Sequence, residues 1–233
     1  MSTDGEIVRL DPTDKAQLQA VAELHSTLLP SSPIPGLGTD FMTRFYYRTL
    51  VEDGLVGCFL YQVGERYVGF LAFTEHPGTF MSEGRRRHLL RLLFVVGLAV
   101  LTKPSRVRVL WETVVIGRRE GRRPEGRRPA AAPAGVGEVL SFGVLEGFRG
   151  GAPGRRISNR LFDATIQHLE ERGARRLEWN VEKSNVRGQQ FYQSYGARLE
   201  ESAVAGEHEL RGWIDLGGPR TAHGDRLAEE PVT

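Results

Sequence analysis

The sequence has very little cysteine and very little lysine. Its only cysteine is Cys58, so no internal disulfide can form, and a reducing, cytoplasmic compartment is expected. Because Cys58 lies in an apolar, strand-like run, we interpret it as a core residue and not as a nucleophile. Arginine supplies 28 of the 31 basic residues, and we attribute this bias to a GC-rich bacterial genome. The net charge of +2 is too small to indicate a nucleic-acid partner by itself.

Motifs for several common chemistries are also missing. The six histidines show no paired spacing suited to a metal ion, and no Walker loop, nucleophile elbow or HExxH motif occurs, so we expect no metal. The first five residues lack the basic-then-apolar pattern of a secretory signal. The strongly apolar stretch Leu89–Leu101 has 13 residues, whereas a membrane-spanning helix needs about 20. The composition, 40% hydrophobic and 26% charged, is that of a soluble globular protein.

The most informative segment runs from Val139 to Leu161, with the sequence VLSFGVLEGFRGGAPGRRISNRL. An apolar run predicts a strand, an Arg-Gly-rich turn follows, and a helical pattern begins at once. Helix N-termini carry unpaired N–H groups and a partial positive charge, and glycine lets such groups approach an anion closely. Arg149, Arg155 and Arg156 add positive charge around the turn. The pattern predicts a phosphate-binding turn; a tight βα turn in any α/β protein is the alternative.

The rest of the chain alternates between strand and helix patterns. Asp11 followed by Pro12 predicts a helix start, with a capping carboxylate and proline at the first helical position. The Phe45-Tyr46-Tyr47 cluster is expected in the core, although it could line a substrate cleft. Apolar periodicity predicts strands over 7–10, 56–63, 67–74, 139–145, 175–181, 198–204 and 209–216, and helices over 11–28, 41–50, 155–172 and 185–195.

Residues 76–117 are predicted to be a helical insertion. A basic cluster, Arg85 to Arg87, precedes the apolar stretch Leu89–Leu101. This pattern favours a helical lid packed on the sheet; the alternative is a helix that lies on a membrane surface. Residues 118–135, which contain three Gly-Arg-Arg repeats, are predicted to form a disordered loop. We expect this loop to be solvated; contact with nucleic acid or anionic lipid is the alternative. Residues 217–233 are predicted to be a flexible tail.

A second motif follows about 35 residues after the Arg-Gly-rich turn, with the sequence NVRGQQFYQSYGA from Asn185 to Ala197. The two motifs together resemble the GNAT (GCN5-related) N-acetyltransferases, whose acetyl-CoA motif, Arg/Gln-x-x-Gly-x-Gly/Ala, is similar to Arg149 through Gly154. The resemblance implies an α/β (α+β) fold with a mixed central sheet of about seven strands, flanking helices, and the insertion between strands 3 and 4. It also implies one domain over residues 1–216. Ala152 replaces the internal motif glycine, and Pro153 removes one N–H donor.

The resemblance further implies the reaction, which is attack of an amine on the thioester of acetyl-CoA. It places the Val144 N–H on the thioester carbonyl and Asn185 on the pantetheine arm or a bound water. Tyr192 is the candidate general acid for the departing thiolate; the alternative is a packed aromatic residue that hydrogen-bonds the cofactor. Glu138 is the expected general base, with Glu178 and Asn180 as alternatives. The implied pyrophosphate-binding main chain is Arg149, Gly150, Gly151, Ala152, Gly154 and Arg155.

Two other functions stay open at this point. One is a GNAT-like module that binds acyl-CoA without turnover, because Ala152 and Pro153 depart from the motif. The other is a membrane-surface or nucleic-acid adaptor that acts through the basic insertion. For the enzyme we expect a small-molecule amine acceptor and no nucleic acid, while a homodimer and a peripheral membrane contact are undecided.

Overall fold

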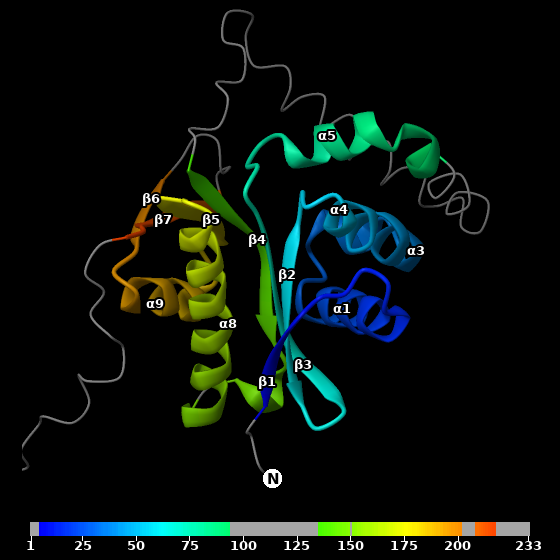
Figure 1. The fold of residues 1–233 in the computed structure, drawn as a ribbon. Helices are drawn as coiled ribbons and strands as arrows, with labels where there is room; N and C mark the ends of the chain where they lie inside the picture. Colours follow the sequence, from blue (N-terminus) through cyan, green and yellow to red (C-terminus); the bar gives the residue numbers. More distant parts are fainter. Residues whose placement is uncertain (1–4, 94–134, 150, 202–207, 218–233) are drawn as a thin grey trace, which may run out of the picture.

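The computed structural model describes residues 5–93, 135–149, 151–201 and 208–217, and residues 151–156 by their backbone alone. Within these residues, one mixed seven-stranded sheet has the order β1-β2-β3-β4-β5-β7-β6, with helices on both faces (Figure 1). β4 and β5 are parallel, and the other neighbouring strands are antiparallel. The strands are β1 (Glu6–Arg9), β2 (Gly57–Val63), β3 (Arg66–Thr74), β4 (Val136–Val144), β5 (Arg176–Glu182), β6 (Arg198–Glu201) and β7 (Glu209–Asp215). The predicted sheet is confirmed.

Helix α1 (Lys15–Leu28) packs on β3 and β4 and begins later than the sequence predicts. Its N-cap is Asp14, whose carboxylate accepts the N–H groups of Ala16 and Gln17. Asp11, the predicted cap, instead accepts the N–H and hydroxyl of Thr13 in a turn that precedes the helix. The predicted start at Asp11 and Pro12 was therefore wrong, because two aspartates three residues apart can each cap and only one does.

The predicted helix over 41–50 is a chain of short pieces that cover the same face of the sheet as α1. Tyr46 and Tyr47 are buried together with Phe45, so this aromatic cluster lies in the core. The pieces are α2 (Pro33–Gly36), α3 (Thr39–Phe41), the π-helical turn η1 (Met42–Tyr46) and α4 (Thr49–Glu52). Cys58 is buried in the same core, as expected, and burial raises its pKa.

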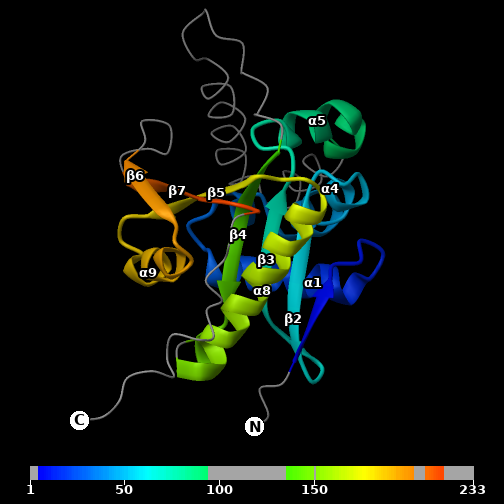
Figure 2. The same cartoon turned by 60° about the vertical axis from the view of Figure 1, so that its left-hand side comes forward.

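Helix α8 (Gly151–Glu171) covers the opposite face and packs on β2, β3 and β4 (Figure 2). Its predicted apolar stripe is fully buried: Ile157, Leu161, Phe162, Ile166 and Leu169. The helix starts four residues before the predicted Arg155, because the sequence of its first turn carries no apolar periodicity that could indicate it. α9 (Val186–Ser194) follows β5, close to the predicted position.

The insertion between β3 and β4 begins with α5 (Phe80–Arg87). Leu89, Leu90 and Leu93 follow it and are 49%, 83% and 57% exposed. The rest of the predicted helical insertion, the predicted loop and nearly all of the predicted tail lie outside the described residues. None of the helices that can be described has the length and hydropathy needed to cross a bilayer.

Candidate active site

The parallel strands β4 and β5 stay together for only three residue pairs. These pairs join Val136–Glu138 to Arg176–Glu178. Beyond them, β4 continues along β3 to Val144 and β5 continues along β7 to Glu182, so the two strands diverge (Figure 2). The rest of β4 therefore has no strand on this edge within the described residues. We call this gap the β4–β5 split.

Two main-chain N–H groups of β4 point into the split. The Leu145 N–H donates to the Val68 carbonyl at 2.8 Å, which is the β3 side. Since successive N–H groups of a strand point to opposite edges, those of Val144 and Phe142 point to the open edge. The sequence prediction named Val144 alone. Phe142 was missed, although the two-residue period of a strand would have indicated it once Val144 was chosen.

A β-bulge at Leu140 changes the side-chain pattern of β4. The pairing with β3 shifts by one residue between Ala72–Ser141 and Phe73–Val139, so β4 contains one extra residue there. Such bulges bend a strand and re-aim its side chains. As a result Ser141 contacts α1, and Glu138, three residues earlier, lies on the same side, where it acts electrostatically on Tyr46.

The predicted anion-binding turn leads directly into α8. A 3-10 turn, η2 (Glu146–Phe148), is followed by the helix start at Gly151. The N–H groups of Gly151 and Ala152 have no acceptor within the helix, because they belong to its first turn. Pro153 lies in that turn too, so its missing N–H costs no helical hydrogen bond. Gly154 lies a turn from the start, where its N–H donates within the helix.

Arg149 is already engaged within the chain. Its main-chain N–H donates to the Glu146 carbonyl at 3.0 Å, and its side-chain Nε donates to the Val144 carbonyl. The Arg149 N–H is therefore not available to a pyrophosphate in this conformation, whereas the guanidinium lies at the end of β4. Like Gly154, Arg155 has its N–H inside the helical ladder. Gly150 lies outside the described residues, as do the side chains of Arg155 and Arg156.

Asn185 is the N-cap of α9. Its Oδ1 accepts the Gly188 N–H at 2.9 Å, so the carbonyl of the side chain is used by the helix. Its Nδ2 has no hydrogen-bond acceptor among the described residues and stays a donor. A methyl group on Gly188 would lie 2.6 Å from that nitrogen, so glycine is what gives the carboxamide its room.

Tyr192 lies on the α8 side of the split. It is 7% exposed, and its ring stacks on Trp179 of β5 with the centroids 4.2 Å apart and the planes at 24°. Burial raises the pKa of Tyr192. Trp179 in turn lies flat against Gly212 of β7, where an added Cβ would be 2.3 Å from the indole Nε1. Within the described part of the chain, that buried Nε1 has no hydrogen-bond partner.

Glu138 lies on the α1 side, at the last pair before the split. Its pairing partner on β5 is Glu178. Burial, and secondarily the charge of Glu178, raises the pKa of Glu138, while Arg211 opposes the shift. Arg211 itself is bonded to Glu178 at 2.5 Å. A carboxylate held above its ordinary pKa next to a cleft is suited to general-base catalysis. Asn180, the other predicted alternative, is exposed on the diverging part of β5.

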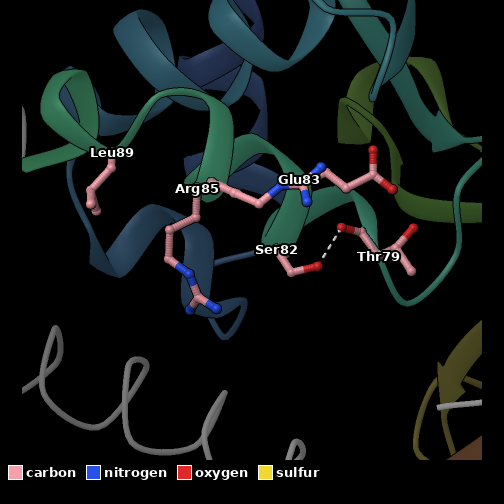
Figure 3. Close-up of a pocket in the computed structure, with 6 residues that line it drawn as sticks. Thr79, Ser82, Glu83, Arg85 and Leu89 are labelled. Carbon is pink, nitrogen blue, oxygen red and sulfur yellow. Dashed lines mark hydrogen bonds between the residues drawn. The ribbon is translucent and has the colours of Figure 1, made fainter. Parts of the chain in front are cut away.

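A shallow cavity of about 600 Å³ lies elsewhere, along α5 (Figure 3). It is lined by Thr79, Ser82, Glu83, Arg85, Arg86 and Leu89. It contains no predicted site residue, and α5 lies at the opposite end of β4 from the start of α8 (Figure 1). Among the described residues, no group of three or more histidine, cysteine or acidic side chains is placed to hold a metal ion.

A protein-family model and several solved structures match this chain. The family model described as "Acetyltransferase (GNAT) family" matches residues 19–197. No curated protein matched. Solved structures that match include the GNAT domain of PAT from S. lividans, with 14% identity, TM-score 0.53, and 91% of this chain and 90% of that one covered. Another is a GNAT-family acetyltransferase from Streptococcus pneumoniae, with 12% identity, TM-score 0.52, and 92% and 100% covered.

A third matching structure is the ribosomal-protein-S18-alanine N-acetyltransferase from Escherichia coli, with 10% identity and TM-score 0.51. The match covers 96% of this chain and 99% of that one. At these identities the structures show a shared fold and nothing finer. The family model, in contrast, spans most of the chain and includes both motifs around the split. The chain therefore belongs to the GNAT acetyltransferase family.

Proposed function

We propose that this protein transfers an acetyl group from acetyl-CoA to a primary amine, by direct attack of the amine within a ternary complex. Membership of the family supports acyl transfer from an acyl-CoA in general. The observation that supports the finer proposal is the β4–β5 split, where, in the part of the chain that the structure describes, no strand lies beside the N–H groups of Phe142 and Val144. Glu138 and Tyr192 flank this split from its two sides.

The described residues fit an acyl-CoA. The open edge of β4 offers donors at the spacing of a strand, which suits the extended pantetheine arm with its amide groups. The first turn of α8 offers the N–H groups of Gly151 and Ala152 together with the positive end of the helix dipole, which suits the diphosphate. The Nδ2 of Asn185 is a further donor. The cofactor supplies an activated thioester when bound.

Three groups of the chain then have separable tasks. Glu138 accepts the proton that an alkylammonium, with a pKa near 10, must lose before its nitrogen attacks the thioester carbon. The N–H group of Val144 stabilises the negative charge that develops on the carbonyl oxygen. The Phe142 N–H is two residues away along the strand, about 7 Å, so it contacts another group of the same ligand. Tyr192 donates a proton to the sulfur as the C–S bond breaks.

The burial of Tyr192 sets a limit on this last step. With solution pKa values of about 10 and 8.5, proton transfer from a phenol to a thiolate is uphill by about 2 kcal/mol. Because burial raises the pKa of Tyr192, the transfer in the protein is more uphill than that. The same low-polarity surroundings also raise the pKa of the leaving thiol, which works in the opposite direction.

The test measures thiol release from acetyl-CoA with a panel of primary amines. We expect turnover with at least one amine and a loss of about 100-fold in kcat for Tyr192→Phe, with CoA affinity unchanged in calorimetry. The matched control is Tyr195→Phe on the same helix, whose hydroxyl bonds the Asp163 carboxylate at 2.9 Å and lies outside the proposed mechanism. A protein that does not bind CoA would refute the proposal. CoA binding with no turnover on any amine would favour the non-catalytic module instead.

A further inference from the structure

A buried histidine on the α1 side of the split is not used by the mechanism above. His25 of α1 is 0% exposed. Its Nδ1 lies 2.7 Å from the hydroxyl of Tyr47, and its Nε2 lies 3.3 Å from the Ser32 hydroxyl and 3.4 Å from the Ser141 hydroxyl. We call these four residues the His25 network. It joins α1, the loop after it, the helical pieces around η1 and strand β4.

The hydrogen-bond partners of His25 determine which of its two ring nitrogens carries the proton. Tyr47 is fully buried, and its hydroxyl has His25 as its one partner among the described residues. If Nδ1 carried the proton, the Tyr47 O–H would be buried without an acceptor, which is costly. Tyr47 therefore donates to Nδ1, and the ring proton is on Nε2. That single N–H is shared by two serine hydroxyls, which explains why both distances are long.

The ring stays neutral at physiological pH. Burial lowers the pKa of His25 to about 4. A neutral ring with a fixed tautomer is a directional donor and not a charge. Its role is thus to hold the two hydroxyls, and not to exchange protons with a substrate.

The two hydroxyls belong to two segments that border the split on the α1 side. Ser141 immediately precedes Phe142, whose N–H points into the split, and follows Glu138 by three residues. Ser32 belongs to the loop after α1, and the neighbouring Ser31 hydroxyl donates to Glu182 of β5 at 3.5 Å. The loop is thus tied to β4 through His25 and touches β5 through Ser31. It therefore connects the two diverging strands on the face that carries Glu138.

We infer that His25 is a positioning residue for amine acetylation, which orients Ser141 and fixes the loop at Ser32 across the β4–β5 split. This inference rests on the proposed function, because it assigns the loop and Ser141 to the acceptor side of that reaction. The Ser141 side chain is buried, with 6% of its surface exposed, and its hydroxyl accepts from His25. It therefore acts by holding β4 next to Phe142 in place, and not by contact with the acceptor.

Kinetics on the full chain test the inference. We expect His25→Leu and Ser141→Ala to raise the KM of the amine about tenfold with CoA affinity unchanged, because both variants disturb the acceptor side alone. His25→Gln, whose carboxamide nitrogen can replace Nε2 as a donor, is expected to stay within about threefold of wild type. The matched control for loss of a hydroxyl is Ser26→Ala, since Ser26 on α1 bonds only the Ala22 carbonyl, at 2.8 Å.

Two measurements decide the inference without any activity. The ¹⁵N chemical shifts of the His25 ring separate a protonated from an unprotonated nitrogen, and we expect the proton on Nε2. Hydrogen exchange of residues 29–38 is expected to speed up in His25→Leu and Ser32→Ala and not in Ser26→Ala. Any one of three results would overturn the inference: a proton on Nδ1, unchanged hydrogen exchange in His25→Leu and Ser32→Ala, or a wild-type KM for the amine in folded Ser141→Ala. If the wild-type protein shows no turnover, the proposed function fails, while the ¹⁵N shifts of His25 and the hydrogen-exchange rates still test the network.

Discussion

Gly212 controls the position of Tyr192 without touching it. The missing side chain of Gly212 leaves room for the Trp179 indole, on which Tyr192 stacks. In Gly212→Ala the new methyl would be 2.3 Å from Nε1 and 2.5 Å from Cε2 of Trp179, whereas ordinary contacts lie at 3.4–4 Å. The indole must therefore withdraw by about 1 Å, and the stacked phenol ring must move with it.

The expected size of the effect follows from this displacement. Overpacking a core typically costs about 2 kcal/mol of stability, which for a chain of this length lowers Tm by roughly 4–8 °C. A displacement of about 1 Å at a catalytic group can reduce the rate about 100-fold. We therefore expect Gly212→Ala to bind CoA normally, to stay folded at 25 °C, and to lose about 100-fold in kcat in the thiol-release assay.

A double-mutant cycle with Trp179→Phe provides the control. Phenylalanine lacks the pyrrole ring that the new methyl meets, so the two changes should not add: Gly212→Ala with Trp179→Phe should be no slower than Trp179→Phe alone. The reasoning is refuted if Gly212→Ala keeps wild-type kcat. It is also refuted if the two single losses add in the double variant, because the methyl would then act through another contact, such as Leu199 at 2.9 Å.

Three further predictions concern other parts of the site. Glu178→Gln should move the acid limb of the pH profile of kcat/KM to lower pH. It removes a negative charge that helps to raise the pKa of Glu138, and it frees Arg211, whose positive charge lowers that pKa. Glu138→Gln should abolish the acid limb. Gly188→Ala should weaken CoA binding roughly tenfold in calorimetry, because the new methyl group displaces the Asn185 carboxamide. Its Tm should change little, because the higher helix propensity of alanine, about 1 kcal/mol, offsets the stability lost at the disturbed N-cap. The lowered pKa of His25, about 4 against 6.5 in the unfolded chain, means that the unfolded state takes up a proton first as pH falls. Stability should therefore decrease between about pH 6.5 and 4, by about 3 kcal/mol in urea titrations, and His25→Gln should remove that decrease.

Local patterns in the sequence predicted the elements well where one periodicity dominates. The strands β2 and β3, the apolar stripe of α8 and the start of α9 after Asn185 are all where the pattern placed them. The region 41–50 was predicted as one helix because its apolar spacing continues through it. The structure interrupts that helix with a π-turn, and the Thr49 hydroxyl bonds the Arg44 carbonyl five residues earlier, an interaction that periodicity cannot report.

The motifs named candidate site residues, whereas their arrangement in space was not predictable. Glu138 and Val144 lie on β4 at the split, but the split itself depends on where β5 leaves β4, which is a property of pairings distant in sequence. The same holds for the His25 network. His25 meets Tyr47 22 residues away and Ser141 116 residues away, so the sequence could say only that its histidines lack metal spacing.

The unpaired edge of β4 has a consequence for inhibitor design. Phe142 and Val144 present donors two residues apart, which in an extended strand is about 7 Å. A peptidomimetic with carbonyl groups at that repeat would bind these donors, which we propose for the pantetheine arm, by backbone complementarity alone. Such a compound needs no nucleotide and no phosphate, so it would avoid the charge that keeps CoA analogues out of cells.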